Sequence, residues 1–574
     1  MHELVIRGAT IVDGTGAERF PGDVAIDGGV VTEVAAHPRG ERIADVGYET
    51  IDADGLLLTP GFVDIHTHYD GQIRWDPWLT PSCWHGITTS VLGNCGVGFA
   101  PAKPAERDLL ADLMEYVEAI PGDVLRAGLD WAWESFPEYL DVLDRGQYVM
   151  DVAAQIPHSA LRVYVMGQRG VDDEPATDDD IAAMAALVRD AMQAGALGFS
   201  TSRTLAHIGI DGRPVPGTYA TERELFAIGD VLGEVGTGVF EVAPLGSAGE
   251  DPTGPLRELE WMVRLAARIR RPVSFVLLQI DSAPGLWREV LAGANQAAAR
   301  GAQVRPQIAG RPFGLLSGLQ TTHPFTTRPS YEKIASLPLA ERVAAMRDPA
   351  VRAAILSERD PTQPATSRQY EKVFVLGDPP DYEPGPERSI AAIAAAEGRD
   401  AEDVYYDRLL EDDGRQFLTV PLLNYSEGSA DPLREMIVDP CATVGLGDGG
   451  AHLGQICDVS MTTSMLTHWA RDRSRGEGLP LELVVRRMTR DTAELYGFGD
   501  RGVVAPGARA DLNLVDFDRL RLRQPEWVDD LPAGGGRLVQ RADGYVATFV
   551  GGVAVSRDDE VTGARPGRLV RGTG

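Results

Sequence analysis

The residues of this sequence best suited to chemistry are two histidines and one distant aspartate. His66 and His68 end a hydrophobic segment that begins at Leu56, and Asp448 ends a second one that begins at Ala442. Alternate residues of a strand point to the same side, so we expect both imidazoles to project together. Such a pair can hold a divalent cation when further ligands converge, and Asp448 is the natural partner. An isolated His-x-His is more often an ordinary polar pair, but the string around this one is specific.

The elements that must position these residues alternate along residues 56–310. Short runs rich in Val, Ile, Leu and Ala are followed by amphipathic helical stretches, a pattern typical of strand–helix units around a parallel sheet. One helix opens with a capping box at Thr177–Asp180 and closes at Gly195; the next opens at Thr221–Glu224 and closes at Gly236. Counting the strands predicts a closed (β/α)8 TIM-like barrel, with reactive groups at the carboxyl ends of its eight strands. These ends are expected near His68, Cys95 and His158, at Ser200–Arg203, at Glu241–Ala243, near Gln279 and Gln307, and at Asp448.

Both ends of the chain consist of short strand-like runs with glycine turns. We expect them to pair as one small β-sandwich domain formed from both chain termini. The segment from about 311 to 440 is polar, Pro-rich and partly helical. A long insertion of this kind before the last barrel strand, at the catalytic face, predicts a lid. The predicted domains are residues 1–57 and 497–574 for the two parts of the sandwich, and 58–496 for the barrel with its insertion.

Composition excludes several classes of function. The 574 residues carry a net charge of -31, which disfavours nucleic acid and anionic membranes as partners. No run of apolar residues is long enough to cross a bilayer, and the strand-like start at Met1–Arg7 does not resemble a signal peptide, so we expect a soluble, cytoplasmic protein. The four cysteines are too scattered for a disulfide framework and should be reduced thiols: Cys83, Cys95, Cys441 and Cys457.

Taken together, the motifs resemble the amidohydrolase superfamily and, within it, the N-acyl-D-amino-acid deacylase (D-aminoacylase) family. The resemblance covers nearly the whole chain. It rests on short strings spread from the first strand to the last: Val5–Gly14, Pro60–Asp70, Gly86–Thr89, Leu92–Gly96, His158–Arg162, Gly195–Thr201, Gly447–Asp448 and Gly507–Leu512.

The resemblance implies a metal-dependent barrel. In it, His66 and His68 hold one divalent ion, Cys95 takes the place of a bridging carboxylate, and Asp448 is a metal ligand and the general base. The chemistry of these residue types agrees, because a thiol beside a cation loses its proton and zinc accepts mixed sulfur and nitrogen ligands. Water beside such a cation becomes acidic near neutral pH, so Asp448 can take its proton and later return it to a departing amine.

The sequence departs from the family pattern at two strands. Family members place histidines at the ends of the fifth and sixth strands, whereas here these strands read Val239–Ala243 and Ser274–Gln279, without histidine. Glu241 is a candidate replacement ligand in the fifth strand, or it pairs with Arg203. Gln279 stands where a basic residue usually contacts the substrate carboxylate.

Two further residues are candidates for substrate binding. Arg203 could hold a substrate carboxylate through its planar guanidinium group. His158 is either a hydrogen-bonded structural residue or a contact to substrate or metal.

The sequence thus predicts a hydrolase that acts on carbon–nitrogen bonds other than peptide bonds. We expect it to cleave an amide bond of a small N-acylated amino acid or related amide, with one or two zinc ions or another divalent metal. The partner is the small-molecule substrate, and self-association as a homo-oligomer is compatible with the sequence. Two alternatives stay open at this point. One is hydrolysis of a cyclic amide or imide; the other is an impaired amidohydrolase scaffold that acts as a binding or accessory protein.

Overall fold

Eight parallel strands close into a barrel within the residues that the computed structural model describes, which are 1–37, 42–44, 47–209, 212–358 and 369–572. Strand β8 (Asp151–Ala154) continues into β9 (Ile156–Pro157). The barrel closes where the His68 N–H group, beyond β6 (Phe62–Asp64), donates to the Gly449 carbonyl, beyond β17 (Thr443–Val444), at 2.7 Å. The strands are β6 (Phe62–Asp64), β7 (Ile87–Leu92), β8 (Asp151–Ala154), β10 (Gly198–Ser202), β11 (Val239–Ala243), β12 (Val273–Val276), β13 (Val304–Ile308) and β17 (Thr443–Val444). The predicted (β/α)8 barrel is confirmed, and each strand ends within four residues of the predicted position.

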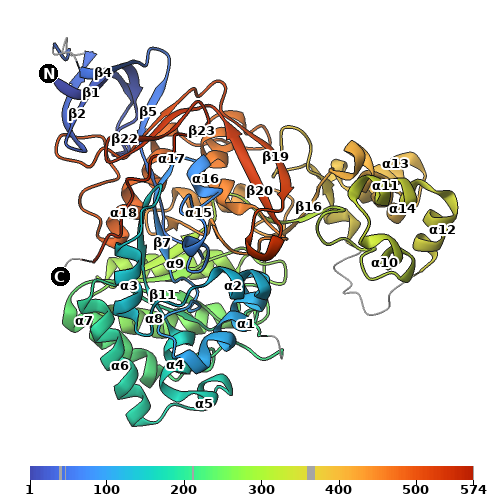
Figure 1. Ribbon diagram of the computed structural model, residues 1–574, viewed down its shortest axis with the longest axis horizontal. Coiled ribbons are helices and arrows are strands. Elements are labelled where there is room, and N and C mark those ends of the chain that lie inside the picture. The colour runs from blue at the N-terminus through green and yellow to red at the C-terminus, as the bar shows by residue number, and fades with distance from the viewer. Residues whose placement is uncertain (38–41, 45–46, 210–211, 359–368, 573–574) are drawn as a thin grey trace.

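Helices follow the strands and cover the outside of the barrel (Figure 1). The predicted capping box opens α6, where the Thr177 hydroxyl accepts from the Asp180 N–H group at 3.2 Å. Helix α7 ends at Gly236 with a left-handed φ of 84°. No helix among the described residues is both long and apolar enough to span a bilayer. The covering helices include α1 (Arg107–Val117), α2 (Gly122–Gly128), α3 (Phe136–Asp144), α4 (His158–Met166), α5 (Gln168–Val171), α6 (Asp178–Gln193), α7 (Glu222–Val235), α8 (Gly254–Ile269), α9 (Leu286–Ala299), α15 (Asp431–Val438), α17 (Leu481–Met488) and α18 (Arg490–Tyr496).

The two ends of the chain pair in one mixed sheet; the sequence predicted this pairing, in the form of a small β-sandwich. Its strands run in the order β23-β22-β21-β18-β5-β1-β2-β3, with β4 beside β1. The join between the termini is the antiparallel pair β5–β18, in which Leu58 lies opposite Leu514. Apolar side chains from both ends, including Ile6, Val24 and Phe549, form a common buried core. The strands are β1 (His2–Ile11), β2 (Phe20–Asp27), β3 (Val30–Ala36), β4 (Gly47–Asp52), β5 (Leu57–Pro60), β18 (Leu512–Val515), β21 (Tyr545–Val550), β22 (Val553–Arg557) and β23 (Glu560–Val561).

The insertion before the last barrel strand forms a lobe of its own. Its helices gather at one side of the molecule, beyond β16 (Figure 1), and they bury a separate core that includes Phe325, Tyr331 and Tyr405. Two antiparallel strands, β14 and β16, run between this lobe and the mouth of the barrel. The elements of the lobe are β14 (Phe313–Ser317), α10 (Pro329–Ala335), α11 (Leu339–Arg347), α12 (Pro349–Ser357), β15 (Phe374–Val375), α13 (Ile390–Glu397), α14 (Ala401–Leu409) and β16 (Leu418–Leu423).

Candidate metal centre

His66 and His68 lie side by side just beyond the carboxyl end of β6. Both side chains are buried, and their ring centroids are 5.4 Å apart. The side chain of Thr67, which lies between them in sequence, contacts the neighbouring strand instead: its hydroxyl donates to the Val91 carbonyl at 2.8 Å. The alternation along the extended chain therefore gives the two imidazoles a common side, as the sequence predicted.

Cys95 joins this pair from a tight turn after β7. The turn needs glycines on either side, because a Cβ atom on Gly93 would lie 2.2 Å from the Gln155 carbonyl oxygen and one on Gly96 would lie 2.6 Å from a backbone nitrogen. It brings the Cys95 Sγ atom to 3.2 Å from Nε2 of His66. One donor atom from each of His66, His68 and Cys95 lies within 4.8 Å of the other two.

Asp448 approaches the same histidines from beyond β17. Its backbone has a left-handed φ of 46°, and its N–H group donates to the His66 carbonyl at 3.2 Å. The Oδ1 atom lies 3.6 Å from Nε2 of His66 and 3.8 Å from Nε2 of His68. The barrel closure thus places the carboxylate of the last strand against the imidazoles of the first.

This set of donors fits a divalent cation. Zinc binds imidazole nitrogen at about 2.0–2.1 Å and thiolate sulfur at about 2.3 Å, so the ligand atoms around one ion stand about 3–4 Å apart. The contacts of His66 with Cys95 and Asp448, at 3.2 and 3.6 Å, fall in that range. Sulfur and imidazole together favour zinc over harder ions such as magnesium.

Two further side chains lie behind the histidines, Gln307 in a hydrogen bond to His66 and Glu118 at ion-pair distance from His68. Nδ1–H of His66 donates to Oε1 of Gln307 at 2.8 Å, and Nδ1 of His68 lies 3.3 Å from Oε1 of Glu118. A proton on Nδ1 leaves Nε2 free to bind a metal ion, and a carboxylate behind a ligating histidine is a common arrangement at zinc sites. Sequence reasoning missed Glu118. The spacing of the sequence could have indicated it. Leu110, Met114 and Glu118 are four residues apart, so the Glu118 carboxylate at the C-cap of α1 lies on the same buried face as the two apolar side chains.

Burial controls the protonation of the site. Desolvation raises the pKa of Asp448 to about 8, with smaller contributions from Asp458 and Asp64, and raises the pKa of Cys95 well above its usual value. Desolvation also lowers the pKa of His66 to about 4, so its imidazole is neutral and able to bind a metal. A cation among these groups would favour the ionised forms of the thiol and the carboxylates. The electrostatics of the site therefore fit a metal ion.

Glu241 lies fully buried in β11, beside the turn of Cys95. Its Oε2 atom accepts from the Cys95 N–H group at 3.0 Å, and its Oε1 atom has no hydrogen-bond partner among the described residues. It is not part of the three-donor group. Burial raises the pKa of its carboxyl to about 8. The expected alternative pairing with Arg203 is wrong, since Arg203 binds Glu258 instead. A role for Glu241 as a ligand stays a prediction.

The three predicted substrate-binding residues lie outside the cavity at the metal centre. His158 uses both ring nitrogens, with Thr201 at 2.8 Å and Glu224 at 3.0 Å, as its structural interpretation predicted. Nε of Arg203 donates to Glu258 at 2.7 Å. Gln279 bridges the sixth strand to the insertion, since its Oε1 atom accepts from the Ser426 N–H group at 3.2 Å. The structure does not bring these three side chains to the metal centre.

A cavity of about 260 Å³ opens over the donors. His207 and His452 line it, and neither was predicted as a site residue. Nδ1 of His207 lies 2.9 Å from the Ser202 hydroxyl, and Nε2 of His452 lies 3.7 Å from Oε2 of Glu118. Both imidazoles are neutral, because burial lowers the pKa of His207 to about 3 and that of His452 to about 4. These histidines come from loops, where strand counting gives no guidance.

Known proteins share this sequence pattern and fold. A family model described as the amidohydrolase family matches residues 49–556. An uncharacterized protein of Mycobacterium tuberculosis is 29% identical, over 98% of this chain and 93% of its own length. N-acyl-D-glutamate deacylase of Alcaligenes xylosoxydans xylosoxydans is 27% identical, over 90% of this chain and 88% of its own.

The fold also matches a solved structure. N-acyl-D-glutamate deacylase from Bordetella bronchiseptica, determined with zinc and a phosphonate inhibitor, superposes with a TM-score of 0.65 at 24% identity, over 99% of both chains. The similarity to these relatives, together with the donor set described above, identifies the protein as a metal-binding, D-aminoacylase-like hydrolase. The chain belongs to the amidohydrolase family, and with it to the enzymes that hydrolyse carbon–nitrogen bonds other than peptide bonds.

Proposed function

We propose that the protein uses one zinc ion to hydrolyse the amide bond of a small N-acylated amino acid or related acylamine. The observation that carries the proposal is the convergence of His66, His68 and Cys95, whose donor atoms lie within 4.8 Å of one another. Asp448 stands beside them, 3.6 Å from Nε2 of His66. A single ion is favoured because the fifth and sixth strands offer no histidine for a second one.

Each residue has a distinct task in this proposal. His66, His68 and Cys95 hold the ion, while Gln307 and Glu118 keep the imidazoles in the tautomer that presents Nε2. When bound, a divalent ion supplies Lewis acidity, which polarises an amide carbonyl and makes water more acidic.

Asp448 is the proposed proton carrier. Its carboxylate takes a proton from the attacking water, and the same carboxylic acid then gives that proton to the nitrogen of the departing amine. One water molecule is consumed, and a carboxylic acid and an amine are formed. The position of Asp448 beyond the last barrel strand is one at which barrel enzymes carry reactive groups.

The same residues would serve a cyclic amide or imide, because water attack on the carbonyl is common to both substrates. A catalytically impaired scaffold is the remaining alternative, and the missing histidines of the fifth and sixth strands favour it. The burial of unpaired acidic side chains argues against the scaffold. Such burial costs free energy of folding, and a binding protein without a metal gains nothing in return.

Elemental analysis of the purified protein tests the proposal, beside a variant that carries both His66→Ala and His68→Ala. About one zinc ion per chain is expected in the wild type and none in the double variant. A panel of N-acylamines, N-acyl amino acids and cyclic amides would then be assayed with wild type and Asp448→Asn. Hydrolysis by the wild type, lost in Asp448→Asn with its metal retained, supports the mechanism. Absence of metal after incubation with zinc would refute it and favour the scaffold.

A further inference from the structure

The cavity over the metal centre has apolar walls. The β14 and β16 strands of the insertion contribute Phe313, Leu315 and Leu422, and the end of the sixth barrel strand contributes Val276 and Leu278. At about 260 Å³ the cavity is slightly smaller than most sites for small molecules. It therefore suits a compact apolar group next to the reacting bond.

The ionisable side chains that line this cavity are acids, a thiol and neutral histidines. Glu118 and Asp448 line it, and none of the described residues that line it is lysine or arginine. A divalent ion at the centre would not supply a free positive charge, because the thiolate of Cys95 and the carboxylate of Asp448 would balance it. A second carboxylate placed here would lose its hydration without gaining a cationic partner.

The two side chains that could have bound a substrate carboxylate are engaged elsewhere. Arg203 is held between Glu258, at 2.7 Å, and the ring of Trp261, 5.9 Å from its guanidinium carbon. Oε1 of Gln279 accepts from the Ser426 N–H group at 3.2 Å, and its Nε2–H group donates to the Pro284 carbonyl at 3.3 Å. Turning either side chain toward the cavity would break these partly buried hydrogen bonds.

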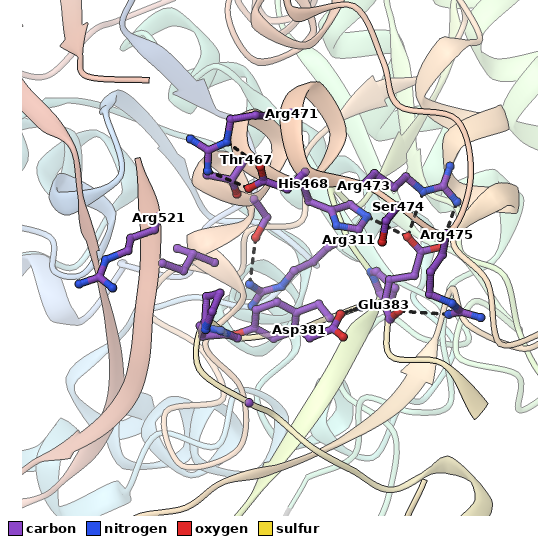
Figure 2. A pocket seen from close by; sticks show the side chains of 18 of the residues that line it. Arg311, Asp381, Glu383, Thr467, His468, Arg471, Arg473, Ser474, Arg475 and Arg521 are labelled. Atoms are coloured by element: carbon purple, nitrogen blue, oxygen red, sulfur yellow. Dashed lines mark hydrogen bonds and ion pairs between the residues drawn. The ribbon is translucent and has the colours of Figure 1, made fainter. Parts of the chain in front are cut away.

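The arginines that the chain does gather line a different pocket (Figure 2). There Arg311 pairs with Asp458 at 2.9 Å, and Arg473 pairs with Glu383 at 2.9 Å. Figure 2 shows Glu383 beside both Arg473 and His468; its Oε2 atom lies 2.9 Å from Nε2 of His468. That pocket shares no lining residue with the cavity at the metal centre. The arginines of that pocket are therefore not available to a substrate bound at the metal centre.

We infer that the substrate is a neutral amide without a free carboxylate, and that a compact apolar group of it occupies the cavity. The inference rests on the proposed function and narrows it: an N-acylamine fits the walls, whereas an N-acyl amino acid places its carboxylate among Glu118, Asp448 and leucine side chains.

Matched substrates test the inference. N-acetyl-3-methylbutylamine is N-acetyl-D-leucine without its carboxylate, and N-acetyl-D-leucinamide keeps the full shape without the charge. We expect kcat/KM for the two neutral compounds to exceed that for the acid at least about tenfold. Equal or faster hydrolysis of the acid would overturn the inference.

A binding experiment separates this inference from the proposed function. Isovaleryl hydroxamate and succinyl monohydroxamate share one metal-binding group, but only the second adds a carboxylate. Their affinities are measured by the change in visible absorption of the cobalt-substituted protein, with no turnover required. At least about tenfold tighter binding of the isovaleryl compound supports the inference even if no amide is hydrolysed. Tighter or equal binding of the succinyl compound contradicts it even if amides are hydrolysed.

The wall itself can be tested by substitution at Leu278. Leu278→Arg places a cation in the cavity, and Leu278→Met keeps the length and the apolar character as a matched control. We expect the arginine variant to shift the ratio of the two hydroxamate affinities toward the carboxylate at least about tenfold relative to the methionine variant. Metal content measured in both variants shows whether the site is intact. An unchanged ratio in a metal-loaded arginine variant would count against the acidic, apolar cavity as the source of selectivity.

Discussion

Sγ of Cys95 lies 3.2 Å from Nε2 of His66, a contact that joins the loops beyond β6 and β7. If both bind one ion, Cys95→Ser should weaken metal affinity by more than the roughly 10–100-fold typical of losing an outer partner. The cobalt-substituted protein should also lose its sulfur-to-cobalt charge-transfer absorption. Cys83→Ser, at another buried cysteine, is the control and should keep both. A charge-transfer band that survives in Cys95→Ser would remove Cys95 from the ligand set.

Glu118 is expected to strengthen the site through His68. Burial raises the pKa of Glu118 well above its usual value, and a cation at the centre would favour its ionised form. Glu118→Gln removes that carboxylate 3.3 Å from Nδ1 of His68, so we expect zinc affinity to fall roughly 10–100-fold, measured by competition with a chelating dye. Glu115→Gln, three residues earlier on α1 and outside the cavity lining, is the matched control and should bind zinc as the wild type does. Equal affinities for the two variants would show that Glu118 does not act on the metal centre.

The metal-free protein should lose stability as pH rises through the range in which Asp448 ionises. Burial raises the folded-state pKa of Asp448 to about 8 from an ordinary 3.8. The folded state then holds a proton that the unfolded state has released, so the free energy of unfolding falls between about pH 4 and pH 8. Asp448→Asn has no ionisable group at this position. The free energy of unfolding of the variant minus that of the wild type should therefore increase from pH 4 to pH 8, measured by urea titration without metal.

Excess zinc should raise the free energy of unfolding of both proteins, because His66, His68 and Cys95 remain in Asp448→Asn and a ligand that binds only the folded state stabilises it. A stability difference between wild type and Asp448→Asn that is constant from pH 4 to pH 8 in the metal-free state would refute the raised pKa.

Glu224, which binds His158 and Arg162, is expected to contribute to the stability of the fold and not to metal binding. Oε1 of Glu224 lies 3.0 Å from Nε2 of His158 and 2.5 Å from Arg162, all three being buried. Glu224→Gln would leave Arg162 without this charge partner, so we expect a loss of about 3–5 kcal/mol in the free energy of unfolding. Glu222 lies in α7 like Glu224 and forms an exposed pair with Arg264 of α8, so Glu222→Gln is the control and should cost at most about 1 kcal/mol. Loss of zinc from folded Glu224→Gln would contradict the structural role.

The sequence by itself determined the barrel and the positions of its strand ends. Hydrophobic runs, the capping box at Thr177 and the glycine at Gly236 are local signals, and each depends on a few neighbouring residues. His66 and His68 could be placed on one side because the alternation of a strand is fixed by backbone geometry. Asp448 could be joined to them because parallel strands in a barrel present their carboxyl ends at one face.

The tertiary structure alone decided which side chains surround those donors. Glu118 reaches His68 from the end of α1, and Leu315 reaches the cavity from an insertion far along the chain. Arg203 and Gln279 sit at predicted strand ends, yet Glu258 and Ser426 hold them away from the cavity. Such contacts join residues that are distant in sequence, and they depend on packing between elements, for which local periodicity carries no signal. The sequence therefore determined where the metal centre lies, while packing decided the charge and shape of the cavity above it.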